Sequence, residues 1–577
     1  MTLATGGLSD KGYQLGQYLS SNKEQLSQAA QNPLLWSAVV GGMLTTGAAS
    51  VGAAKAVGPA KTLIHTGLYR DPGEILIGYR HGRFLTRHPV YHGLLDRFMH
   101  LQVIAPTGQA KTTLLVSFAW QDLLNGLTVF SLETAGDLSF ELMARAQVLN
   151  RPIHYFNPAD TLAMKWNPLS GDPEIVAERA VTTFQSAVSS GNEDFFKNFN
   201  SMVLRHSIMA LAAYEHNEGR EPNMRKLSSF LVDEDYRGKV LGLGSGKKIA
   251  ANSASKDSDA KAEGKQGAKG GKGSKGGSKD KQQTVVNIPG LNPDTKAWFE
   301  KQFLTAYTQR QRVEFTSGLQ ASLELLLGRT MVKEALSPED GEPQLKMDEA
   351  LDSGGLVLPC IPQGIVGDTS TRVLSTWMLL DFQQAVRARG EGGYPVMAYL
   401  DEAHNMLGHS SSDAAQTFST FVTQARHHHV GLTLAYQSFA LLPWELRATL
   451  GSNARSKLIS GGGDPFDAEQ TQALMGYEEA EVTDRRRNYR GLLSGPGSYS
   501  VGTREQEKAR YSLDDIRSIP RGSWLFSQVK NGQLQQPRLV TARIAPKPRP
   551  RRESGVSRPK AALEREEQVE RKTAGVF

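Results

Sequence analysis

Residues 396–404 read VMAYLDEAH, which is five apolar residues followed by two acids, an alanine and a histidine. A continuous apolar run of this length is typical of a strand buried on both faces, as in a parallel sheet that helices cover on each side. Such sheets bind ligands outside the carboxyl ends of their strands. The stretch therefore predicts that Asp401 and Glu402 stand at a ligand-binding edge of an α/β protein.

A phosphate-binding loop is predicted far upstream, directly after the apolar run Leu101 to Ile104. Residues 105–113 there read APTGQAKTT. In such a loop, backbone N–H groups and a helix N-terminus face the phosphates, a lysine reaches the outer phosphates and a hydroxyl group binds Mg²⁺. Lys111 and Thr112 supply the lysine and the hydroxyl. The residues expected around the phosphates are Pro106, Thr107, Gly108, Gln109, Ala110, Lys111, Thr112 and Thr113.

The loop departs from its usual pattern at two positions. Ala105 and Ala110 stand where glycines are usual. The second departure matters more, because a glycine before the lysine eases the backbone turn. Two interpretations stay open: either the loop tolerates alanine, or it binds nucleotide weakly.

The two motifs together predict an ATPase that uses ATP and Mg²⁺. Asp401 would then help Thr112 to hold Mg²⁺, and Glu402 would polarise the attacking water. The next apolar run, Val430 to Tyr436, ends in Gln437, a polar side chain placed to sense the γ-phosphate. The alternative is that these are surface acids and an amide that merely follow strands.

The order of the apolar runs predicts an α/β fold with a parallel sheet, because they alternate with segments of helical period. Alternating apolar residues from Ile75 to Phe84 predict a small hairpin ahead of the phosphate loop. The predicted strands are 101–104, 127–132, 153–156, 356–360, 396–400, 430–436, 458–460 and 524–529.

With 577 residues the chain is too long for one core, and its pattern changes along its length. Apolar residues at helical spacing predict that residues 174–351 are mostly helical, and within them the Lys/Gly/Ser tract 246–283 has almost no apolar content. Such a tract cannot bury enough surface to offset its ordering entropy, so we predict that it is disordered. The expected parts are an N-terminal region 1–60, a nucleotide-binding domain in two pieces, 66–173 and 352–544, an inserted all-α domain 174–351, and a charged flexible tail 545–577.

A transmembrane helix is predicted at residues 34–54, which carry no charge and are rich in Ala, Gly, Val and Leu. The segment has about the 20 residues that a bilayer-spanning helix needs. Basic residues follow from Lys55 onward, which would keep the C-terminal bulk in the cytoplasm. The competing interpretation is an Ala/Gly-rich soluble helix or linker.

The overall composition excludes few classes of binding partner. A net charge of +7 and a pI near 9.1 permit a nucleic acid or an anionic membrane without demanding either. The single cysteine, Cys360, excludes an internal disulfide, suits a reducing compartment, and has the apolar neighbours of a buried structural thiol. Arg485, Arg486, Arg487 and Arg490 form a basic cluster that fits either a DNA contact or a solvated loop.

Over roughly residues 70 to 530, the sequence resembles the coupling proteins of type IV secretion, the TraG/TraD-type ATPases of conjugation. The similar features occur in the same order along the chain. They are APTG at 105–108 before Lys111, GDL at 136–138, FNP at 156–158, NPL at 167–169, the helical insertion, QAR at 424–426, GLTLAYQS at 431–438, NAR at 453–455 and LMG at 474–476.

The resemblance implies a RecA-like ATPase domain with an all-α insertion and an N-terminal membrane anchor in the bacterial inner membrane. It implies that Lys111, Thr112, Asp401, Glu402 and Gln437 act as described above. Arg426 would be the arginine that acts on the neighbouring subunit of a ring, with Arg455 as a second candidate.

The function implied is the use of ATP hydrolysis to drive DNA, single-stranded with a bound relaxase, into a type IV secretion channel. The expected assembly is a homo-hexamer. One alternative is a soluble DNA pump of the HerA or FtsK type, which would not need residues 34–54 to enter a bilayer. Another is a non-hydrolysing substrate receptor with a degenerate phosphate loop, which Ala110 would signal.

Overall fold

The computed structural model describes residues 73–81, 87–187, 194–243, 285–407, 413–487, 499–543 and 545. The predicted membrane helix at 34–54, the Lys/Gly/Ser tract at 246–283 and nearly all of the predicted tail lie outside these ranges. Within the ranges, no helix has both the length and the apolar character that a membrane span requires.

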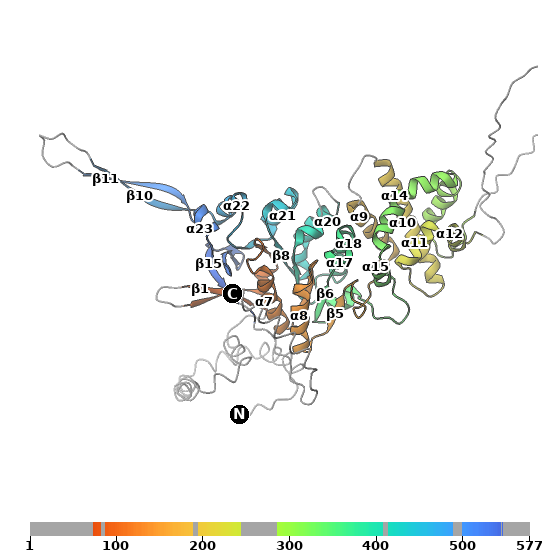
Figure 1. The fold of residues 1–577 in the computed structure, drawn as a ribbon, viewed down its shortest axis with the longest axis horizontal. Helices are drawn as coiled ribbons and strands as arrows, with labels where there is room; N and C mark the ends of the chain where they lie inside the picture. The colour runs from red at the N-terminus through yellow and green to blue at the C-terminus, as the bar shows by residue number, and fades with distance from the viewer. Residues whose placement is uncertain are drawn as a thin grey trace, which may run out of the picture. The chain divides into compact units, whose positions relative to one another are not determined.

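Eleven strands of the described chain form one large sheet (Figure 1). Its order is β2-β1-β15-β12-β9-β3-β8-β7-β4-β6-β5. The strands from β9 to β5 in this order run parallel, and the remaining four extend the sheet in antiparallel fashion. The strands are β1 (Ile75–His81), β2 (Arg87–His92), β3 (Leu101–Ile104), β4 (Thr128–Leu132), β5 (Ile153–Phe156), β6 (Leu356–Pro359), β7 (Val396–Leu400), β8 (Val430–Tyr436), β9 (Ser456–Ile459), β12 (Ser523–Ser527) and β15 (Arg538–Ala542).

The predicted parallel sheet and the predicted hairpin, β1 with β2, are confirmed. Both faces of the sheet are buried, as strand β7 illustrates. Val396, Ala398 and Leu400 belong to one hydrophobic core, while Met397 and Tyr399 belong to the other. This alternation follows from the period of two in a strand, and it explains why every residue of the strand is apolar.

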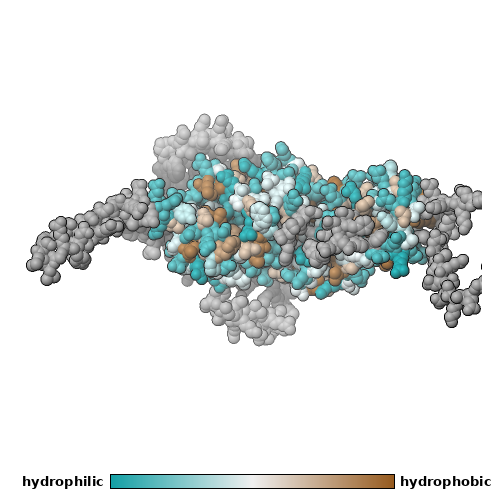
Figure 2. All heavy atoms as spheres, turned by 90° about the horizontal axis from the view of Figure 1, so that it is seen from above, coloured by the Kyte–Doolittle hydropathy of each residue, from teal (hydrophilic) through white to brown (hydrophobic). Residues whose placement is uncertain are grey.

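Helices cover the two faces of the sheet. On one side lie α7 (Lys111–Leu124) and α8 (Asp137–Val148), and on the other α18 (Asp368–Ala388) and α20 (Asp413–Gln424), as Figure 1 shows. Phe130 of β4 stacks on Phe382 of α18 with ring centroids 4.1 Å apart. On the face drawn in Figure 2, hydrophobic residues occur in small groups among hydrophilic ones, since the large apolar side chains lie in the two cores.

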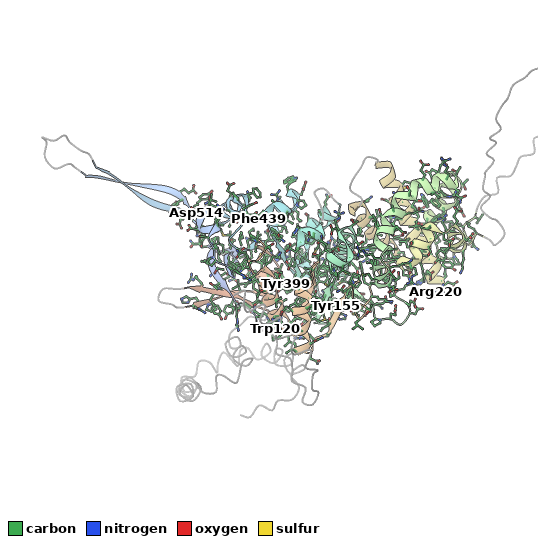
Figure 3. All side chains as sticks on the ribbon, in the orientation of Figure 1. Trp120, Tyr155, Arg220, Tyr399, Phe439 and Asp514 are labelled. Carbon is green, nitrogen blue, oxygen red and sulfur yellow. The ribbon has the colours of Figure 1, made fainter. Side chains whose placement is uncertain are left out.

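A buried polar cluster joins Arg97 and helix α7 to strand β7 of the sheet. The guanidinium of Arg97 forms an ion pair with Asp122 at 2.6 Å and donates a further bond to the hydroxyl of Tyr399 at 3.1 Å. Tyr399, labelled in Figure 3, in turn donates to Asp122. Buried charges of this kind need complete pairing, so the cluster fixes α7 against β7.

The segment between β5 and β6 is helical, as predicted. It packs against α18, one of the helices that cover the sheet: the indole of Trp166 donates to Asp381 of α18 at 3.0 Å, and Arg179 of α9 pairs with the same carboxylate. Its apolar residues continue the core on that face of the sheet, and its status as a separate domain stays a prediction. Its elements are α9 (Pro173–Ala187), α10 (Asp194–Asn217), α11 (Met224–Val232), α12 (Glu234–Val240), α13 (Pro293–Ala297), the π-helix η2 (Trp298–Phe303), α14 (Gln309–Leu327), α15 (Thr330–Ala335) and α16 (Met347–Leu351).

Two expectations need correction. Arg485 to Arg487 lie in a long two-stranded ribbon and not in a loop, and strand β15 was not anticipated. Arg490 lies outside the described residues. The ribbon is β10 (Tyr477–Arg487) with β11 (Tyr499–Ala509). The other elements are α6 (Leu94–Arg97), α17 (Gln363–Val366), α19 (Ala403–Leu407), η3 (Ala425–His428), η4 (Phe439–Leu441), α21 (Trp444–Asn453), α22 (Pro465–Met475), α23 (Leu513–Arg517), β13 (Val529–Lys530) and β14 (Gln533–Leu534).

The single cysteine has the structural character that the sequence predicts. Cys360 is buried at the end of β6, and burial raises the pKa of its thiol to about 12. A thiol with so high a pKa carries almost no thiolate at neutral pH, so it is not a nucleophile.

The buried imidazole of His100 makes the fold sensitive to acid. Its Nδ1 accepts a bond from the N–H of Leu432 at 3.1 Å and its Nε2 lies 2.8 Å from the carbonyl of Val422, so the neutral ring satisfies both contacts. Burial lowers the pKa of His100 to about 4. The unfolded chain binds the proton more tightly than the folded chain does. We therefore expect the free energy of unfolding to fall by about 2–3 kcal/mol, because of this group, as the pH falls from 7 to 4.5.

Thermal unfolding of wild type and His100→Gln at pH 7 and pH 4.5 measures this cost. The variant should be less stable at pH 7, and its deficit should shrink at pH 4.5. A deficit that is the same at both pH values would contradict the assignment.

Candidate nucleotide-binding site

The topology brings the two predicted motifs to one edge of the sheet. Strand β8 lies between β3 and β7, and all three are parallel. Their carboxyl ends therefore share one edge. The loop 105–110 follows β3, the acids Asp401 and Glu402 follow β7, and Gln437 follows β8.

At this edge the side chains form one polar network. The ammonium of Lys111 lies 2.5 Å from Oε1 of Glu402 and 3.1 Å from Oδ1 of Asp401. The hydroxyl of Thr112 donates to Oδ2 of Asp401 at 3.3 Å. The amide of Gln437 lies 3.2 Å from each oxygen of Glu402. The loop thus contacts both acids directly.

Gln437 also connects the acids to the start of the loop. Its Oε1 accepts a bond from the hydroxyl of Thr107 at 3.4 Å. The network consequently runs from Thr107 through Gln437 and Glu402 to Lys111, and each of these side chains has another polar group to hold it in position.

The electrostatics of the network depend on the lysine. Burial raises the pKa of Asp401, and the positive charge of Lys111 opposes that rise. His404, whose Nδ1 lies 3.5 Å from Oε2 of Glu402, has its pKa lowered, mainly by burial. The imidazole is therefore neutral at neutral pH, and Lys111 is the cation that balances the two acids.

Two residues of the site have left-handed backbone conformations. Ala110 has φ 65° and ψ 30°, and Glu402 has φ 54°. For residues with a Cβ this conformation costs roughly 1–2 kcal/mol. The loop therefore forms its turn with alanine before Lys111, and strain is stored at two positions of the site, as is common where function requires a fixed geometry.

The glycine run that follows β9 lies against the phosphate loop, a feature that the sequence analysis missed. A Cβ built on Gly462 would be 3.0 Å from the amide nitrogen of Gln109. The other amide atom of that side chain, Oε1, is buried without a hydrogen-bond partner among the described residues. Three consecutive glycines, 461–463, are the signal that could have indicated a close approach of backbone.

Some expected residues lie elsewhere. Arg426 and Arg455 precede β8 and β9, so they stand at the amino edge of the sheet, opposite the phosphate loop. They line a cavity of about 530 Å³ there. Thr113 lies in the first turn of α7 and Pro106 lies in the loop, and in the described chain neither is joined to the acids by a hydrogen bond.

Glu133, at the end of β4, is a further acid on the carboxyl edge. Its carboxylate accepts bonds from the backbone N–H groups of Gly136, Leu138 and Ser139. These are the free donors of the α8 N-terminus, so Glu133 acts as a structural cap and not as part of the network.

The observed set of groups fits Mg²⁺ and a nucleotide phosphate. It offers one ammonium, two hydroxyls, two carboxylates and an amide around the start of a helix, with Gly108 in a positive-φ conformation, φ 87°. Hard oxygen ligands and a lysine at a helix N-terminus are the chemistry that a magnesium-bound phosphate requires.

A mostly parallel sheet flanked by helices, with a phosphate loop after one strand and an acid pair after a strand two positions away, defines a RecA-like P-loop NTPase fold. Neither a family model nor a curated protein matches the sequence.

Solved structures share the fold. The bacterial conjugative coupling protein TrwB, in an unbound form, is 14% identical with a TM-score of 0.54, and the match covers 84% of this chain and 92% of that one. TrwB in complex with a non-hydrolysable GTP analogue is also 14% identical, with a TM-score of 0.53 over 84% and 93%. TrwB in complex with ADP and Mg²⁺ is 14% identical with a TM-score of 0.51, and the match covers 79% of this chain and 88% of that one. The RecA-like fold implied by the resemblance is thus confirmed, whereas the separate all-α domain and the membrane anchor stay predictions.

The left-handed Ala110 provides a test of strain in the loop. Ala110→Gly should raise the free energy of unfolding by about 1 kcal/mol, because glycine adopts positive φ without steric cost. Nucleotide affinity should not fall. Chemical denaturation and titration with a fluorescent ATP analogue measure the two quantities.

The matched control is Ala321→Gly, an exposed position within helix α14, which should lower stability by a similar amount. A loss of stability in Ala110→Gly comparable to that of the control would show that the left-handed turn is not strained.

Proposed function

We propose that this chain is a coupling ATPase of the type IV secretion family, which binds ATP with Mg²⁺ and hydrolyses it to move DNA. The observation that carries the proposal is the contact of Lys111 with both Asp401 and Glu402, with Gln437 on the second acid. A surface pair of acids would not be held by a buried lysine of a phosphate loop.

Each side chain receives a role from its contacts. Lys111 would hold the outer phosphates, and Thr112 with Asp401, which already share a hydrogen bond, would hold Mg²⁺. The bound ion supplies charge neutralisation at the transferring phosphate. When Lys111 turns to the phosphates, the Glu402 carboxylate loses its cation and becomes free to orient a water molecule and accept its proton.

Gln437 is placed to report on the phosphate. Its amide bonds Glu402 and Thr107 on opposite sides, at 3.2 Å and 3.4 Å. A γ-phosphate near Thr107 would compete for these bonds, so the presence of ATP changes the position of a strand end. This supports the sensing role proposed for Gln437.

The positions of Arg426 and Arg455 support a ring. Strand β8 separates Arg426 from Gln437, and its seven residues at about 3.3 Å each span roughly 20 Å. An arginine at that distance does not reach the phosphate site of its own chain, so any action on a nucleotide would be on a neighbour's. We propose a homo-hexamer in which Arg426 has this role, with Arg455 as the second candidate.

The DNA substrate, the bound relaxase, the secretion channel and the inner-membrane location are proposed from the same family. The support is the shared fold with a conjugative coupling protein over 84% of the chain, together with the ordered sequence features. Solved complexes of TrwB with ADP and Mg²⁺ support the proposed cofactors.

ATP turnover tests the proposed site. Lys111→Ala and Glu402→Gln should each lower the rate of phosphate release by at least about 100-fold, because each removes a charge aimed at the reacting phosphate. Lys301→Ala, an exposed lysine of the helical segment, is the matched control.

Circular dichroism should show a native fold for Glu402→Gln, which keeps the size of the side chain. Wild-type turnover in both variants would refute the site. Nucleotide binding without turnover by the wild-type protein would instead favour the non-hydrolysing receptor.

Subunit mixing tests the ring. Arg426→Ala alone should lose turnover, and addition of the Lys111→Ala protein should restore part of it, because each variant supplies what the other lacks. Arg310→Ala, an exposed arginine of α14, should behave as wild type. Turnover per subunit that is independent of protein concentration, with no recovery on mixing, would exclude action between subunits.

A further inference from the structure

A second cavity, of about 620 Å³, lies at the carboxyl edge of the sheet beside the acid pair. Its walls come from the segments that follow three parallel strands of the sheet: α17 and α18 after β6, α19 after β7, and η4 with the start of α21 after β8. The side chains that matter here are Arg372, His404, Leu441, Trp444 and Arg447. Its volume is in the range of small-ligand sites, about 300–1,000 Å³.

Trp444 is the unusual side chain of this cavity. It is 66% exposed, whereas Trp166, Trp298, Trp377 and Trp524 are all buried. Helix α21 packs on the protein through Leu446 and Leu450, which are fully buried, so the fold does not require an indole at its first position. Exposed aromatic rings of this kind serve as binding surfaces, because a large apolar face gains most from being covered.

Two arginines provide positive charge next to the indole. Arg372 and Arg447 are half-buried, and the Nε atom of each is buried without a hydrogen-bond partner among the described residues. The guanidinium of Arg447 lies over the ring of Phe466, 5.9 Å from its centroid, which fixes its position. A partly desolvated guanidinium with unused donors is suited to a phosphate.

We propose that this cavity holds single-stranded nucleic acid, with one base stacked on Trp444 and the adjoining phosphates bound by Arg372 and Arg447. This inference rests on the proposed function and names its substrate contact. The combination of a stacking ring and backbone-binding cations has no sequence preference, as a translocating enzyme needs. A protein partner is less favoured, because the cavity places two arginines beside the ring, neither with a carboxylate partner among the described residues, and its lining includes one acid, Asp368, which already accepts a bond from Gln363.

The position of the cavity connects it to the catalytic acids. His404 lines the cavity, and its Nδ1 lies 3.5 Å from Oε2 of Glu402. Nucleic acid that fills the cavity would contact this imidazole, which also contacts Glu402. Occupancy of the cavity would therefore reach the site of hydrolysis through a single side chain.

The proposal is tested by measuring the affinity of the full-length protein for a labelled oligodeoxythymidine. Fluorescence anisotropy monitors the binding over a range of NaCl concentrations. Trp444→Ala should weaken the affinity roughly 5- to 100-fold, the loss expected for one stacked base. Trp444→Phe should retain most of the affinity. The affinity of the double variant Arg372→Ala/Arg447→Ala should depend less on salt: the slope of log K against log[NaCl] should be shallower by about one to two units.

Phe140→Ala is the matched control, because Phe140 is 62% exposed on helix α8, on the other side of the sheet. Sedimentation of each variant measures self-association in parallel. Equal affinity of wild type and Trp444→Ala would overturn the inference and leave the proposed function standing. Recovery of full affinity in Trp444→Ala at protein concentrations that restore assembly would overturn it in favour of a subunit contact. Failure of the wild-type protein to bind any nucleic acid would overturn the proposed function itself.

Discussion

The contact of Lys111 with Asp401 and Glu402 joins residues about 290 positions apart in the chain, and the rest of the structure is arranged so that it can form. It requires β3 and β7 to lie on either side of β8 with their carboxyl ends at one edge. Bringing three charges together away from water is costly, and an ion pair of this kind adds little net stability. Its value lies in the chemistry that it prepares.

The packing around the site offsets the unfavourable backbone conformations within it. Ala110 and Glu402 have left-handed conformations, each unfavourable by roughly 1–2 kcal/mol. Helices on both faces bury the strands that lead into these residues, and their two cores hold β3 and β7 rigid. A turn that would relax in a free peptide is thereby kept in a conformation that directs Lys111 and Glu402 toward each other.

The charged groups are separated between the two edges of the sheet. The carboxyl edge carries the phosphate loop, the acids and, next to them, the cavity of Trp444; the amino edge carries Arg426 and Arg455 with a cavity of their own. Parallel strands produce this division directly, because every strand begins at one edge and ends at the other. The chain therefore presents its phosphate-binding and acidic groups on one side of the sheet and Arg426 and Arg455 on the opposite side.

The sequence by itself determined the local features of this protein. Short runs rich in apolar residues identified the parallel strands, since a strand buried on both faces carries apolar side chains at most of its positions. The lysine and hydroxyl of the loop, the two acids and the amide of Gln437 were identified because each follows such a run. These inferences need only neighbouring residues.

The tertiary structure alone decided the features that depend on distant partners. The strand order, the antiparallel extension through β12 and β15, and the approach of Gly462 to Gln109 arise from contacts that no local pattern encodes. The same holds for Trp444, which continues the apolar segment 439–444 and would be assigned to a core from sequence. Its exposure follows from the direction in which α21 leaves the sheet, and long-range packing sets that direction.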